Sequence, residues 1–149
     1  MDNDIKENIK KLLEKQPTIS IGTLSEDNKP IVHTVTYVSV EATVYFGTYK
    51  SSRKSLNMQK NNNVSYICDQ YNDINNLLGI KAIQMEGVAS LVTNKEELDR
   101  VSMKLIEKYP VLKNLPTNPN MIFFKIEPAK ARYLDYSKGF GHTDIIDYR

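Results

Sequence analysis

The sequence predicts an α+β protein that is mainly β, in which about six antiparallel strands form a small barrel with helices at its margins. Six short segments are rich in β-branched and aromatic residues, and two longer segments repeat apolar residues at helical spacing. Strands and helices do not alternate as they would around a parallel sheet. The 149 residues, of which 40% are hydrophobic, are expected to form one domain over residues 1–149.

The first third of the chain predicts a helix followed by a hairpin. Apolar residues recur at helical spacing between residues 5 and 13, and Pro17 closes the helix. Residues 18–24 alternate apolar and polar side chains, a polar turn follows at 25–29, and residues 31–38 return as a second strand. A short break at 39–42 is expected before the next strand.

The middle of the chain predicts three further strands. Val44 to Thr48 is β-branched and aromatic, Val64 to Cys68 resembles it, and Ile80 to Val92 is the longest alternating segment. The polar, Asn-rich residues 69–78 predict a surface loop. Gly87 predicts a bulge or bend in the long strand, as closure of a barrel requires.

The last third predicts a second amphipathic helix and a final strand. Thr93 to Glu96 has the pattern of a capping box, and apolar residues then repeat at helical spacing up to Pro110. Residues 121–133 predict the last strand. Pro128 lies near its middle, which favours either an edge position or a bulge.

Composition excludes several functional classes. A net charge of +2 and a charged fraction of 26% do not indicate a general binder of nucleic acid or of membrane surfaces.

The single cysteine, Cys68, lies in an apolar run, so we expect a buried structural thiol and a reducing compartment. Without a long apolar stretch or signal segment in the sequence, we expect a cytoplasmic protein. With histidine only at His33 and His142, we expect no metal site.

The most informative segment is basic and lies between the third and fourth strands. Residues 42–68 contain three lysines and one arginine but no acid. Ser51 or Ser52 is expected to cap a short helix whose first turn holds Arg53 and Lys54. Cations are unfavourable at this positive end of a helix, so an anion such as phosphate would remove the penalty. The alternative is a solvated basic turn.

The order of residues in this segment resembles a known family. Phe46-x-Thr48-x-x-x-Ser52-Arg53-Lys54, followed by Met58, Asn61 and Val64, is similar to the FMN-binding segment of the pyridoxamine 5'-phosphate oxidase-like split-barrel family. The resemblance implies an antiparallel six-stranded split β-barrel with flanking helices. It also implies bound FMN, an oxidoreductase or flavin-linked reductase activity, and a homodimer with the flavin at the subunit interface.

The resemblance also implies which residues hold the cofactor. The segment around His33 is similar to the strand whose backbone runs along the flavin ring, and Gly47 and Thr48 match family contacts after the third strand. An arginine is usual at the position of His33, so the phosphate is expected to depend more on Arg53 and Lys54. The implied cofactor-binding set is His33, Thr34, Val35, Thr36, Gly47, Thr48, Ser52, Arg53 and Lys54. Gln84 is a further candidate.

These residues also have plain structural interpretations. His33 could be a strand residue facing a polar neighbour, Gly47 a strand bulge, and Thr48 a surface hydroxyl. Residues 133–142 lack the Trp and the Arg-rich ending of true pyridoxamine phosphate oxidases, so the resemblance favours the general stress protein and nitroimidazole-reductase-like branch. The glycine-containing end of this segment is either a loop over the flavin or an ordinary tail.

Other functions remain open at this point. A barrel that displays the basic loop with several tyrosines would suit single-stranded nucleic acid, although the positive charge is confined to one stretch. A flavin-storage or sensing protein, or a relative that binds haem or a deazaflavin, is also compatible. A narrow barrel has no room inside for a tricyclic ring, which favours a dimer with the ring between subunits. The alternative is a monomer whose helices cover its apolar faces.

Overall fold

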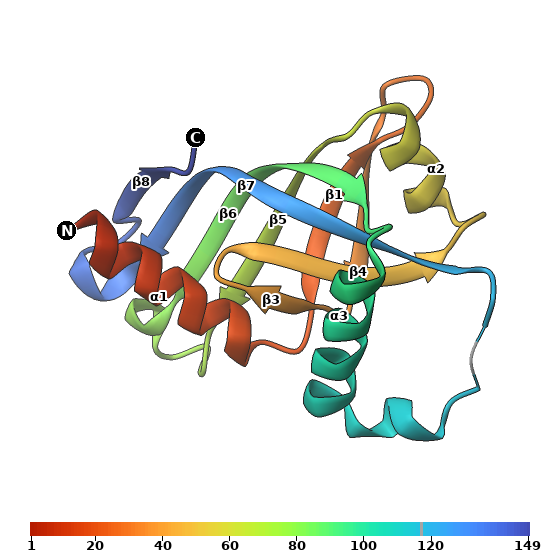
Figure 1. The fold of residues 1–149 in the computed structure, drawn as a ribbon. Coiled ribbons are helices and arrows are strands. Elements are labelled where there is room, and N and C mark those ends of the chain that lie inside the picture. The colour runs from red at the N-terminus through yellow and green to blue at the C-terminus, as the bar shows by residue number, and fades with distance from the viewer. Residues whose placement is uncertain (117) are drawn as a thin grey trace.

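The computed structural model describes residues 1–116 and 118–149 and shows one antiparallel sheet with three α-helices around it (Figure 1). The helices are α1 (Asp2–Lys15), α2 (Arg53–Lys60) and α3 (Lys95–Lys108). The strands are β1 (Ile19–Leu24), β2 (Pro30–Val35), β3 (Val38–Val40), β4 (Thr43–Tyr49), β5 (Asn63–Gln70), β6 (Lys81–Leu91), β7 (Met121–Asp135) and β8 (Thr143–Asp147). The predicted class, a mainly β split barrel with flanking helices, is confirmed.

The sheet follows the order β2-β1-β5-β6-β7-β4-β3, with β8 added beside β7. All of its strand pairs are antiparallel. The sheet curls into a split barrel that stays open between its end strands, β2 and β3. Because β2 ends the order, its outer edge has no partner strand among the described residues.

Residues 1–116 and 118–149 form eight strands where the sequence predicts about six. The strand predicted at 31–38 is wrong in its second half, because β2 stops at Val35 and a new strand, β3, starts at Val38 and pairs with β4. The break predicted at 39–42 is therefore also wrong at Ser39, which lies in β3. The segment switches sheet neighbours at Thr36 and Tyr37. The second difference is β8, which pairs with the end of β7.

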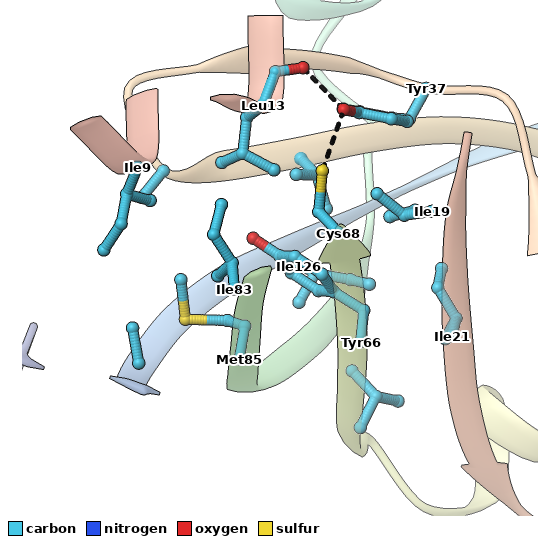
Figure 2. Packing of buried hydrophobic residues seen from close by; sticks show 14 of the residues in the cluster. Ile9, Leu13, Ile19, Ile21, Tyr37, Tyr66, Cys68, Ile83, Met85 and Ile126 are labelled. Carbon is cyan, nitrogen blue, oxygen red and sulfur yellow. Dashed lines mark hydrogen bonds between the residues drawn. The ribbon is translucent and has the colours of Figure 1, made fainter. Parts of the chain in front are cut away.

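The core fills the inside of the curled sheet, where α1 covers it. Ile5, Ile9, Leu12 and Leu13 of α1 are buried against inward-facing residues of β1, β5, β6 and β7. Figure 2 shows the centre of this cluster, where the Tyr37 hydroxyl donates to the Leu13 carbonyl and lies 3.6 Å from Cys68 Sγ. Burial raises the pKa of the Cys68 thiol to about 11. The predicted structural role of Cys68 is therefore confirmed.

The predicted irregularity at Gly87 is a bulge shared by β6 and β7. Glu86 is opposite Lys130 and Gly87 is opposite Pro128, so the register shifts between them. A Cβ at Gly87 would lie 2.8 Å from the carbonyl oxygen of Glu127, which leaves room only for glycine. The bulge predicted at Pro128 is confirmed, and on the side away from β6 no described strand pairs with Pro128, because β4 pairs only up to Ile126 and β8 only from Lys130. The other neighbour of β7 changes near this point from β4 to β8.

The helix α3 covers a second, smaller cluster on the outside of β3 and β4. Val101 and Leu105 pack there against Val38 and Tyr45. The cap of α3 is Asn94, whose Oδ1 accepts from the Glu97 amide at 3.0 Å, so the predicted capping box is wrong by one residue. Among the described residues, no helix combines the length and the hydropathy needed to cross a membrane.

Candidate anion-binding site at the start of α2

The junction between β4 and α2 has the predicted strand-to-helix form. After β4 ends at Tyr49, the Ser52 amide donates to the Tyr49 carbonyl at 2.9 Å and closes a tight turn. The Ser52 hydroxyl accepts from the Ser55 amide at 3.2 Å and caps α2. Of the two serines considered from the sequence, Ser52 is therefore the cap. Figure 1 shows α2 beside the turn between β1 and β2.

Two predicted residues at the end of β4 support this junction. Thr48 is buried, and its Oγ1 lies 2.7 Å from Ser52 Oγ, so it is not a surface hydroxyl. Gly47 pairs in regular register with Phe123, so it is not a bulge. A Cβ at Gly47 would lie 3.0 Å from the Phe123 ring, so a larger residue would require that ring to shift. Of the two residues, Thr48 contacts the capping hydroxyl and helps to fix its position.

The first turn of α2 carries two cations and no acid, although Arg53 is near enough to Asp27 in the turn between β1 and β2 to add to the hydrogen bonds that lower the pKa of that carboxyl. Arg53 is exposed and Lys54 is half-buried. The ion pairs within residues 1–116 and 118–149 include neither of these cations. Both charges add to the positive end of the helix macrodipole. The arrangement suits an anion, which would receive a guanidinium, an ammonium and free backbone N–H groups.

His33 reaches the same place from β2. Its Nε2 lies 2.9 Å from the hydroxyl of Thr23, which in turn accepts from the Asn57 amide at 3.0 Å. Burial lowers the pKa of His33, and the nearby charges of Lys54 and Arg53 lower it further. The structure therefore brings His33 of β2 to the cations of α2. The interpretation of His33 as a strand residue with a polar neighbour is also correct, because that neighbour is Thr23.

The remaining predicted residues of this strand lie farther along it. Thr34 and Thr36 are exposed, whereas the Val35 side chain is buried in the core. Val35 could thus contact a ligand only through its backbone. The backbone at the outer edge of β2 is available for this, because no described strand pairs with that edge.

The outer face of the sheet next to β2 is hollowed. A groove of about 290 Å³ is lined by Ser20, Gly22, Val32, Ser65, Ile67, Gln84 and Arg132 among others. A second groove of about 480 Å³ lies beside it, and Gly22, Ser65 and Glu86 line both grooves. The side chain of Val32 is 71% exposed and that of Ile67 is 36% exposed. Gln84 thus lies on the outer face, in a groove lined by both apolar and polar side chains.

Residues 133–142 comprise the end of β7 and the connection 136–142 to β8, so they are not an ordinary tail. Gly139 and Gly141 have φ values of 134° and 77°, which only glycine adopts readily. The loop presents Phe140, which is 75% exposed, and His142, whose Nε2 lies 3.2 Å from the Asp144 carboxylate. Within the described part of the chain, no group of three or more His, Cys, Asp or Glu side chains is placed to hold a metal ion.

Sequence reasoning missed Thr23 and Asn57. Thr23 is 34 positions from Asn57 and 10 from His33 along the chain, so their contact depends on how α2 packs on β1. Both polar side chains are buried, and no local motif marks either one. The only feature of the sequence that points to Thr23 is that it is polar at an inward-facing position of β1, where Ile19 and Ile21 are apolar.

Comparison with known proteins is consistent with this geometry. Residues 5–135 match the model of the family described as pyridoxamine 5'-phosphate oxidase. A haem-binding protein from Mycobacterium smegmatis has a similar structure, with a TM-score of 0.82 and 14% identity over 95% of this chain and 57% of that chain. General Stress Protein 26 from Bacillus anthracis has a TM-score of 0.71 and 23% sequence identity over 96% of this chain and 98% of that chain.

The haem storage protein HutZ from Vibrio cholerae gives a TM-score of 0.69 and 20% identity over 82% of this chain and 88% of that chain. At these identities the three structures share the fold with this chain. No curated protein matches the chain.

Proposed function

The chain belongs to the pyridoxamine 5'-phosphate oxidase family, and we propose that it is a flavoprotein that binds FMN by its phosphate at the start of α2. One observation carries the proposal. Arg53 and Lys54 lie in the first turn of a helix that Ser52 caps, and this turn contains no acid. Among the described residues, neither cation forms an ion pair. A terminal phosphate also favours FMN over FAD, in which both phosphates are bridged.

The residues present fit a phosphate dianion. Arg53 offers a planar fork of N–H donors, Lys54 an ammonium, and Ser52 a hydroxyl. A charge-assisted hydrogen bond contributes about 1.5–3 kcal/mol, so two such contacts are enough to retain a cofactor during purification. His33 adds a further N–H donor from β2. The buried contact between Thr48 and Ser52 keeps the hydroxyl in place.

The flavin ring would lie outside the barrel, because side chains fill its interior. The free edge of β2 from His33 to Val35, together with Thr36 just after it, offers backbone donors and acceptors to the polar rim of the ring. Bound flavin would supply the hydride and electron transfer, which fits the proposal of an oxidoreductase. The protein groups would bind the phosphate, orient the ring and shield it from water.

We also propose that the working unit is a homodimer with the flavin between the subunits. The outer face of β1, β2, β5 and β6 is hollowed, and it exposes Val32 and Ile67. By contrast, α3 covers the outside of β3 and β4, where Tyr45 is buried. The hollowed face is thus the side on which a partner would give the ring a second wall.

The absorption spectrum of the purified protein tests the proposal directly. We expect the bands of an oxidised flavin, and mass spectrometry of the released cofactor should identify FMN. A protein purified from cells with ample flavin but without flavin bands, and unable to bind added FMN, would contradict the proposal.

Haem binding is a second candidate, favoured by one observation. His142 lies in the loop between β7 and β8, and Asp144 orients its ring through Nε2. An imidazole that a carboxylate orients through one nitrogen can bind haem iron through the other, which in His142 is Nδ1. The proteins from M. smegmatis and V. cholerae are described as haem-binding and haem-storing. A Soret band that disappears in His142→Ala would support this candidate over FMN.

A further inference from the structure

The contact of His33 with Thr23 and Asn57 determines which nitrogen of the imidazole carries hydrogen. We propose that Asn57 and Thr23 are positioning residues that hold His33 as the neutral Nδ1–H tautomer, and that His33 takes up a proton from solvent when a dianion binds beside Arg53 and Lys54. This inference rests on the proposed phosphate site at the start of α2.

The hydrogen-bond directions give the tautomer. The Asn57 amide donates to Thr23 Oγ1 at 3.0 Å, so the Thr23 oxygen acts as an acceptor toward Asn57. Thr23 is 2% exposed, and a buried hydroxyl hydrogen without an acceptor would be costly. The acceptor within reach is His33 Nε2 at 2.9 Å. Nε2 therefore carries no hydrogen in the neutral ring, and the hydrogen is on Nδ1.

The charged groups around His33 keep the ring neutral until an anion arrives. From α2, Lys54 and Arg53 both act on it with positive charge. From β1, its contact is the uncharged Thr23. In the turn between β1 and β2, Asp27 pairs with Lys29 at 3.3 Å and also interacts with Arg53, whose charge adds to the hydrogen bonds that lower the pKa of Asp27. Burial and these cations lower the pKa of His33, so at neutral pH the ring offers Nδ1–H as a neutral donor.

A bound dianion reverses this balance. Its two negative charges offset those of Arg53 and Lys54 and stabilise an imidazolium, in which the added proton is on Nε2. The Thr23 hydroxyl must then turn to accept from Nε2, which costs the same in the free protein and in the complex, so the pKa of His33 should still rise on binding. Between the lower pKa of the free protein and the higher pKa of the complex, binding takes up one proton. The affinity for the dianion should therefore increase as the pH falls through this interval, by up to about tenfold per pH unit.

The tautomer can be measured without any ligand. The chain has two histidines, so His142→Gln leaves His33 as the only imidazole in a ¹⁵N-histidine NMR spectrum. We expect hydrogen on Nδ1 and an unprotonated Nε2 at neutral pH. Thr23→Val should release the ring to the Nε2–H form, and Thr23→Ser, which keeps the hydroxyl, should retain Nδ1–H. An Nε2–H ring in the parent protein would overturn the proposal.

The proton uptake can be measured with sulfate, which remains a dianion from pH 5 to pH 9. The pKa of His33 should rise as sulfate is added, and the affinity for sulfate should rise toward low pH. His33→Gln keeps an N–H donor but cannot titrate, so its sulfate affinity should vary less with pH. An unchanged His33 pKa in the presence of 100 mM sulfate would overturn the proposal.

FMN and riboflavin separate this inference from the proposed function. If the protein binds FMN, riboflavin should leave the pKa of His33 unchanged, because it lacks the phosphate, whereas FMN should raise it. If neither flavin binds, the proposed function fails, and the NMR and sulfate measurements still decide the role of His33.

Discussion

The helices α2 and α3 are capped in the same way, but the charged side chains in their first turns differ. Ser52 caps α2 by accepting from the Ser55 amide at 3.2 Å, and Asn94 caps α3 by accepting from the Glu97 amide at 3.0 Å. The first turn of α3 carries Glu96 and Glu97, as the helix macrodipole favours. The first turn of α2 carries Arg53 and Lys54 and no acid.

The partners of these charges differ as well. Glu97 accepts from the Tyr45 hydroxyl at 2.8 Å and pairs with Lys125 at 3.2 Å, so its charge is used within the fold. Arg53 and Lys54 form no ion pair among the described residues. The start of α3 is arranged for stability, whereas the start of α2 keeps a charge imbalance that a bound anion would correct.

The largest expected effect is on ligand binding at α2. Arg53→Ala combined with Lys54→Ala should weaken FMN binding about 150- to 20,000-fold, because two charge-assisted contacts of about 1.5–3 kcal/mol each are lost. Fluorescence titration of the apoprotein with FMN measures this. Lys95→Ala with Lys113→Ala removes the same charge elsewhere and should leave the affinity unchanged. Equal FMN affinity in both double variants would contradict the phosphate site.

The next effect concerns the face of the sheet beside α2. Val32→Asp places a charge in the proposed subunit interface, so the dissociation constant of the dimer should rise about 10- to 100-fold. Sedimentation equilibrium of the flavin-loaded protein measures it. Met103→Asp, on the exposed side of α3 where we propose no interface, is the matched control. A parent protein that sediments as a single chain with full flavin occupancy would refute the dimer.

The contrast between the helix starts also shows what a sequence can reveal. Ser52, Arg53 and Lys54 are consecutive, so composition and capping rules suffice to predict a basic first turn. The cap of α3 was predicted one residue early, because Thr93 and Asn94 are both good caps and each precedes a glutamate by three positions. Local rules thus find a helix start, but the packing of the helix selects its first residue.

Features that depend on tertiary contacts could not be predicted. The strand predicted at 31–38 divides at Tyr37, which lies in the core with its hydroxyl bonded to the Leu13 carbonyl. β8 was missed because only Ile146 is buried in it, which gives too weak an alternation to identify. The link from His33 through Thr23 to Asn57 joins β2, β1 and α2, and nothing in the local sequence indicates it.

A smaller effect should appear at α3 and depend on pH. The hydrogen bond from Tyr45 and the pairing with Lys125 lower the pKa of Glu97. This contribution to stability is present above the ordinary carboxyl pKa and is lost as the pH falls through the lowered one. Glu97→Ala should therefore reduce the free energy of unfolding by about 1–2 kcal/mol at neutral pH and by less in acid. Urea unfolding at several pH values tests this, and FMN affinity should not change.

The smallest effect tests whether the cations in the first turn of α2 lower the stability of the apoprotein. Arg53→Glu with Lys54→Glu should abolish FMN binding yet raise the free energy of unfolding of the apoprotein by about 0.5–1 kcal/mol, because acids then face the positive end of the helix. The gain should shrink in high salt, which screens exposed charges. The mirror change at α3, Glu96→Lys, should lower stability instead. If the α2 variant were less stable than the parent protein in low salt, Arg53 and Lys54 would have a structural role, and the imbalance would not indicate a ligand.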